Sequence, residues 1–66
     1  MNVNKLKGML VAKGMNVETL AEMIGAERSS LYRKLSNFEK ITIGEALKIK
    51  DALNMSDEEA TEIFLT

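Results

Sequence analysis

The stretch NVETLAEMIGAERSSLYRKL, residues 16–35, decides the fold that we predict from this sequence. Apolar residues recur at helical spacing before Gly25, which predicts a short helix over about 17–24 that ends at the glycine. A second helix then runs over about 27–36, with Leu31 and Leu35 as its one clean inward pair. Because the connection is too short to reverse the chain, the two helices must cross at a steep angle. That arrangement is a helix-turn-helix.

The second of these helices carries mostly polar side chains, which predicts a face that projects from the protein. With Leu31 and Leu35 turned inward, a step of about 100° per residue defines an outward arc, formed by Arg28, Ser29, Tyr32 and Arg33. A projecting helix fits the DNA major groove, where an arginine can bind guanine through two hydrogen bonds. We therefore expect these residues to contact bases. The alternatives are that the arginines contact phosphates or only keep the helix soluble, and that Tyr32 packs partly against its neighbours.

The rest of the chain also has a helical pattern, so we predict an all-α fold of five short helices in a single domain spanning 1–66. The first helix covers about 3–13 and Gly14 ends it. Two capping boxes, Thr42 with Glu45 and Ser56 with Glu59, predict the starts of a fourth helix to about 53 and a fifth over about 57–65. On the fourth helix we expect one core-facing stripe, formed by Ile43, Ala46, Leu47, Lys50 and Leu53.

The stretch 16–35 resembles the helix-turn-helix of the lambda-type phage repressors and Cro proteins, known as the XRE family. The features that carry the resemblance are the small polar cap Asn16, the pair Leu20-Ala21, the aliphatic Ile24, the turn glycine Gly25 and the inward pair Leu31 and Leu35. The resemblance extends over the whole chain and implies a compact five-helix lambda-repressor-like domain, with the helix-turn-helix at helices two and three. It implies a transcriptional regulator, Cro-like and of phage or prophage origin, that represses by occupying operator DNA.

Two residues depart from the pattern of the family. Val17 stands where the family often has a glutamine that contacts a phosphate, and Val17 could instead be a packing residue. Glu27 stands where the family often has a serine or threonine that caps the second helix of the motif. For Glu27 we favour a structural role at the helix N-terminus, which attracts negative charge, over a hydrogen bond from cytosine N4.

The resemblance also implies DNA backbone contacts and a dimer. The start of the second helix and the loop after the third would hold the phosphates, through Asn16, Val17, Lys34, Asn37 and Lys40. Such contacts position a protein without reading sequence. The family forms two-fold dimers through the loop and the side of helix five, which here offer Phe38, Phe64 and Leu65. We expect a homodimer at least on DNA, with half-sites about 34 Å apart.

The charge distribution supports a DNA partner better than the net charge of −1 does. All nine lysines and arginines lie within the first 50 residues, against five acids, while the other five acids lie in the last 16 residues. The first 50 residues therefore carry about +4 and the tail about −5. We expect the acidic last helix to face away from the phosphates.

The composition argues against several classes of protein. The sequence has no cysteine and no histidine, so we expect no disulfide, no metal site and no cofactor, and we find no catalytic constellation. No apolar run approaches the length of a membrane span, and the start at Met1 favours a small cytoplasmic protein. Two other functions stay open: a protein-binding module on the same fold, such as an anti-repressor or antitoxin subunit, and a DNA-binding half whose partner domain lies on another chain.

Overall fold

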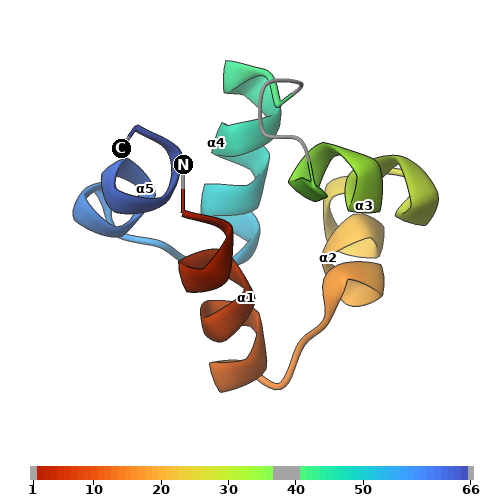
Figure 1. Cartoon of the computed structure of the whole chain (residues 1–66), viewed down its shortest axis with the longest axis horizontal. Coiled ribbons are helices and arrows are strands. Elements are labelled where there is room, and N and C mark those ends of the chain that lie inside the picture. Colours follow the sequence, from red (N-terminus) through yellow and green to blue (C-terminus); the bar gives the residue numbers. More distant parts are fainter. Residues whose placement is uncertain (1, 37–40, 66) are drawn as a thin grey trace.

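The computed structural model describes residues 2–36 and 41–65, and within these ranges all regular structure is helical. The helices are α1 (Val3–Ala12), α2 (Val17–Ile24), α3 (Arg28–Ser36), α4 (Ile43–Ala52) and α5 (Asp57–Phe64). The predicted all-α, five-helix fold is confirmed, and each boundary lies within one residue or so of its expected place. Figure 1 shows α3 at one edge of the molecule and α5 at the opposite edge. No helix in the described ranges is long and apolar enough to cross a membrane.

Helix starts are fixed by side-chain caps. The side-chain oxygens of Asn2, Asn16, Thr42 and Ser56 each accept a hydrogen bond from the backbone N–H three residues later. At Thr42 and Ser56 the glutamate of the capping box also accepts from the backbone N–H of the cap, so both predicted boxes are present. These bonds satisfy amides that a helix cannot pair internally.

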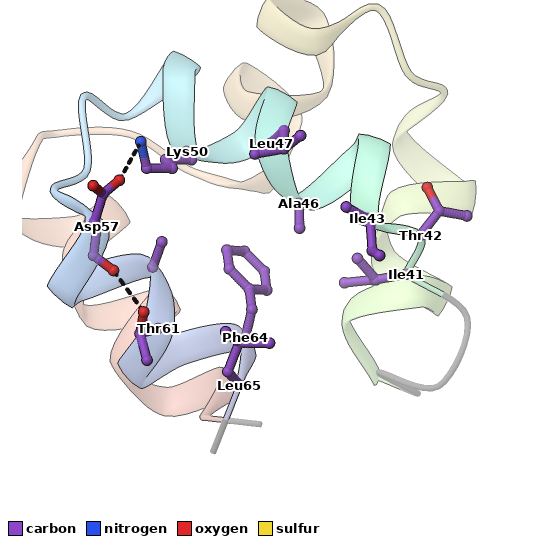
Figure 2. Close-up of a pocket in the computed structure, with 11 residues that line it drawn as sticks. Ile41, Thr42, Ile43, Ala46, Leu47, Lys50, Asp57, Thr61, Phe64 and Leu65 are labelled. Carbon is purple, nitrogen blue, oxygen red and sulfur yellow. Dashed lines mark hydrogen bonds and ion pairs between the residues drawn. The ribbon is translucent and has the colours of Figure 1, made fainter.

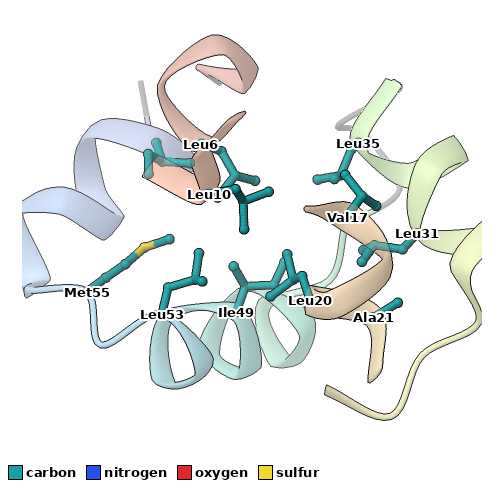
Figure 3. Packing of buried hydrophobic residues seen from close by; sticks show 11 residues of the cluster. Leu6, Leu10, Val17, Leu20, Ala21, Leu31, Leu35, Ile49, Leu53 and Met55 are labelled. Atoms are coloured by element: carbon teal, nitrogen blue, oxygen red, sulfur yellow. The ribbon is translucent and has the colours of Figure 1, made fainter. Parts of the chain in front are cut away.

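One hydrophobic core joins all five helices (Figure 3). Its buried members are Leu6, Leu10, Val17, Leu20, Ala21, Leu31, Leu35, Ile49, Leu53, Met55 and Ile63. The first and last helices are also joined through the backbone, because the N–H of Asn2 donates to the carbonyl of Ile63 over 2.9 Å. No polar or charged side chain is buried among the described residues, so the interior is held by apolar contact.

The expected core-facing stripe of α4 is wrong at two positions. Ile43 and Leu47 are 83% and 55% exposed, whereas Ile49, which was not expected inside, is fully buried together with Leu53. Helix α4 carries two apolar stripes, and the buried one follows the four-residue spacing from Glu45 through Ile49 to Leu53. Because that stripe begins with a charged residue, the sequence pattern pointed to the other stripe.

Candidate nucleic-acid interface

The turn between α2 and α3 is set by Gly25. Its φ of 70° and ψ of 29° place it in the left-handed region, which a glycine enters without steric cost. The N–H of Ala26 then donates to the carbonyl of Ala21 over 2.8 Å, as in a Schellman helix end. A Cβ added at Gly25 would meet nothing within 4 Å, so the backbone conformation is the reason for glycine here. The chain turns sharply and α3 begins three residues later, at Arg28.

Helix α3 is held mainly by α2, through Leu31 and Leu35. Figure 3 shows both leucine side chains pointing from α3 towards α2 and the core. The rest of the helix is largely exposed, including the whole predicted outward arc of Arg28, Ser29, Tyr32 and Arg33. Tyr32 has 51% of its surface exposed, so about half of this side chain is accessible to a ligand. The sequence therefore predicted correctly which face of α3 projects.

Two carboxylates contact this outward arc, which we call the α3 face (Arg28, Ser29, Tyr32 and Arg33). Glu18, in the first turn of α2, forms an ion pair with Arg28, with Oε2 and Nη1 3.1 Å apart. Glu27 accepts a hydrogen bond from the Ser29 hydroxyl over 3.3 Å. The bond of Glu27 stays within its own segment, and the structural role favoured for Glu27 stays a prediction. The ion pair of Glu18 was not anticipated from the sequence.

The residues expected to hold the DNA backbone have different surroundings. Asn16 is exposed, and its Oδ1 is already occupied by the N–H and hydroxyl of Thr19. The Val17 side chain is buried in the core, so only its backbone N–H, at the first position of α2, is suited to a phosphate. Lys34 pairs with Glu45 of α4. Asn37 and Lys40 lie outside the described residues.

Glu45 has two partners that stabilise its charged form. One of its oxygens accepts from the Lys34 ammonium group and the other from the backbone N–H of Thr42. The hydrogen bond from Lys34, aided by the bonds at Thr42, lowers the pKa of Glu45 below its ordinary value, although partial burial opposes the shift. Lys34 thus links α3 to α4 across the segment 37–40.

A second surface feature is an apolar groove between α4 and α5, which we call the α4–α5 groove (Figure 2). Its volume is about 410 Å³, and its lining includes Ile41, Ile43, Ala46, Leu47, Phe64 and Leu65. The Phe64 ring points into the groove in Figure 2, and Leu65 is 78% exposed at its rim. At one end Lys50 and Asp57 form an ion pair of 3.0 Å. Two predicted dimer residues, Phe64 and Leu65, therefore lie together, while Phe38 is outside the described residues.

Ile43 and Leu47 belong to this groove and were missed as surface residues. Their four-residue spacing, offset from that of Ile49 and Leu53, is the sequence signal that would have separated the two stripes. No group of three or more acidic residues within the described part of the chain is placed to hold a metal ion.

Comparison with known proteins gives one family. The family model described as a Cro/C1-type HTH DNA-binding domain matches residues 5–63, which is nearly the whole chain. Neither the curated proteins nor the solved structures provide a match.

Proposed function

The chain belongs to the Cro/C1-type helix-turn-helix family of DNA-binding domains, and on this premise we propose that it is a sequence-specific transcriptional regulator. It acts as a Cro-like repressor of phage or prophage origin, which occupies operator DNA and blocks polymerase. One observation carries the proposal: the α3 face is exposed to solvent while Leu31 and Leu35 hold the opposite side of the helix in the core. For a phage regulator, the place of action is the bacterial cytoplasm.

In this proposal the α3 face enters the major groove and reads bases. Arg28 and Arg33 suit guanine, since a guanidinium can donate to O6 and N7 together. The Ser29 hydroxyl can bond a base or a phosphate, and the Tyr32 ring can contact a thymine methyl group. All four side chains are exposed and come from adjacent turns of one helix, as groove binding requires.

The DNA backbone contacts follow from the same docking. The N-terminus of α2 presents the Asn16 side chain and the Val17 amide. Lys34 of α3 and, after it in the sequence, Asn37 and Lys40 are the other proposed contacts. Backbone amides and helix N-termini are common phosphate ligands. On this model Lys34 contributes less than its charge suggests, because Glu45 already neutralises it.

We further propose that two copies associate through the α4–α5 groove, and that Phe64, Leu65 and Phe38 belong to the contact. Three of the largest exposed apolar side chains, Ile43, Leu47 and Leu65, line this one groove. A clustered apolar surface of this kind marks an association site in small proteins. A two-fold dimer would place two α3 helices in successive major grooves, about 34 Å apart.

Selection of bound sequences from random DNA tests the proposal. We expect a palindromic site whose halves are about one helical turn apart, and binding that weakens steeply with salt as counterions are released. Arg33→Ala should lower the ratio of specific to non-specific affinity, whereas Lys40→Ala should weaken binding to all sequences alike. No enriched sequence, together with binding that salt leaves unchanged, would overturn the proposal.

The α4–α5 groove supports one alternative. A protein-binding module on the same fold, such as an anti-repressor or antitoxin subunit, would use the groove for a different chain. Recovery of a stable heterologous complex, with no DNA binding at low salt, would favour this alternative over the regulator.

A further inference from the structure

We propose that Glu18 is a positioning residue for Arg28: it holds the guanidinium at the α3 face and thereby raises the preference for one DNA sequence over others. The inference rests on the proposed function and adds a specificity-determining residue to it. Glu18 belongs to α2, which contributes nothing to the α3 face itself.

The ion pair bridges the two helices of the motif at their N-terminal ends. Glu18 is in the first turn of α2 and Arg28 is the first residue of α3, and Figure 1 shows α3 crossing α2 at a steep angle. Their charged atoms are 3.1 Å apart, and the side chains are 55% and 61% exposed. The pair is therefore accessible to a ligand that docks on the α3 face.

The geometry leaves Arg28 able to read a base while it is bound. A guanidinium has five N–H donors in one plane, and the bond to Glu18 uses Nη1. The opposite edge, formed by Nε and Nη2, retains the two parallel donors that guanine O6 and N7 require. Because a free arginine side chain loses rotamer entropy when it is fixed, a partner that restrains Arg28 beforehand favours the base contact.

The charge of Glu18 also favours the base contact of Arg28. A cation at a helix N-terminus is disfavoured by the helix dipole, and the Glu18 carboxylate offsets that effect for Arg28. The same carboxylate repels phosphates, which supply nearly all of non-specific affinity. Repulsion of phosphates weakens specific and non-specific binding alike, so the specificity ratio is raised by the support that Glu18 gives to the Arg28 contact.

The test compares Glu18→Gln with Glu22→Gln. Glu22 is exposed one turn further along α2 and forms no ion pair within the described residues, so its replacement removes the same charge from the same helix. Affinities for the selected site and for unrelated DNA are measured at one salt concentration. E22Q should tighten both alike and leave their ratio unchanged. E18Q should lower the ratio about fivefold, the lower end of what a bidentate arginine–guanine contact contributes.

Two further measurements complete the test. In an Arg28→Gln background, E18Q should leave the ratio unchanged, because there is no guanidinium to position. In the free protein, NMR relaxation of the Arg28 Nε–H should show a more restrained side chain than in E18Q, which needs no DNA. Equal ratios for E18Q and E22Q, or equal Arg28 mobility with and without Glu18, would overturn the inference and leave the regulator intact. A wild-type protein without any sequence preference would overturn both proposals.

Discussion

Lys34 of α3 and Glu45 of α4 form an ion pair that ties the projecting helix to the helix after it, while the second oxygen of Glu45 caps α4 at Thr42. One carboxylate thus fixes a helix start and an interhelical contact together. The ion pair requires the charged form of Glu45, and both interactions favour that form, which lowers the pKa of Glu45.

The first prediction concerns acid stability. The pKa of Glu45 is lower in the folded chain than in the unfolded one, so the charged carboxylate stabilises the fold. This contribution to the free energy of unfolding is fully present above pH 4.5, the ordinary pKa, and is lost as the pH falls through the folded-state pKa. The pKa of Glu59 is lowered by its hydrogen bond from Ser56 and acts with the same sign. Urea denaturation should therefore show stability falling below about pH 5.

The variant Glu45→Gln measures how much of the loss of stability in acid is due to Glu45. Glutamine can still close the capping box, but it loses the charge that Lys34 binds. We expect E45Q to be less stable by about 1 kcal/mol at neutral pH and to lose less stability in acid than the wild type. Glu58→Gln, at an exposed position in the first turn of α5, is the control. Parallel pH profiles for E45Q and the wild type would contradict the assignment.

The second prediction separates the two sides of α3. Leu35→Ala removes a buried anchor and should destabilise the fold by about 2–5 kcal/mol, enough to unfold most of so small a protein. Tyr32→Ala, on the exposed side, should change stability by less than about 0.5 kcal/mol and still weaken DNA binding. Circular dichroism during urea unfolding and a gel-shift titration provide the two readouts. Loss of stability in the Tyr32 variant would show that the ring packs against the protein.

The third prediction concerns the turn. Gly25→Ala should destabilise the protein by about 1–2 kcal/mol, because alanine is strained at a φ of 70° although its Cβ has space. Gly8→Ala is the matched control, since Gly8 lies inside α1 with nothing within 4 Å of an added Cβ. That change should stabilise the protein by about 0.5–1 kcal/mol. Effects of the same sign at both positions would rule out the conformational explanation.

The fourth prediction tests association through the α4–α5 groove. Ile43→Lys places a charge on the groove without touching the core, so it should shift the protein to monomer and weaken operator binding while the fold stays intact. Val11→Lys is the control, because it alters another exposed apolar residue, on α1, that does not line the groove. Sedimentation velocity measures both variants against the wild type. If the two behave alike, the groove is not the contact between copies.

Local signals in the sequence were sufficient for most of the fold. Caps such as Thr42 and the turn at Gly25 depend on interactions within a few residues, so spacing alone predicted them. The buried side of α4 depends instead on how the helix docks, and the charged Glu45 at the head of the buried stripe concealed it. The same limit applies to Glu18, whose partner Arg28 is ten positions away and on another helix. Sequence spacing could identify the exposed side of α3 but not what touches it.

The two opposed apolar stripes of α4 have a consequence for a saturation mutagenesis experiment. In a selection for cellular abundance, variants with polar replacements at Ile49 and Leu53 should be depleted, because these residues lie in the interior. In a selection for repression, applied to variants that accumulate normally, variants with polar replacements at Ile43 and Leu47 should be depleted. The helix α4 and its C-cap Leu53 would then show two interleaved patterns of tolerance, offset by two residues. One pattern would report selection for folding and the other selection for assembly.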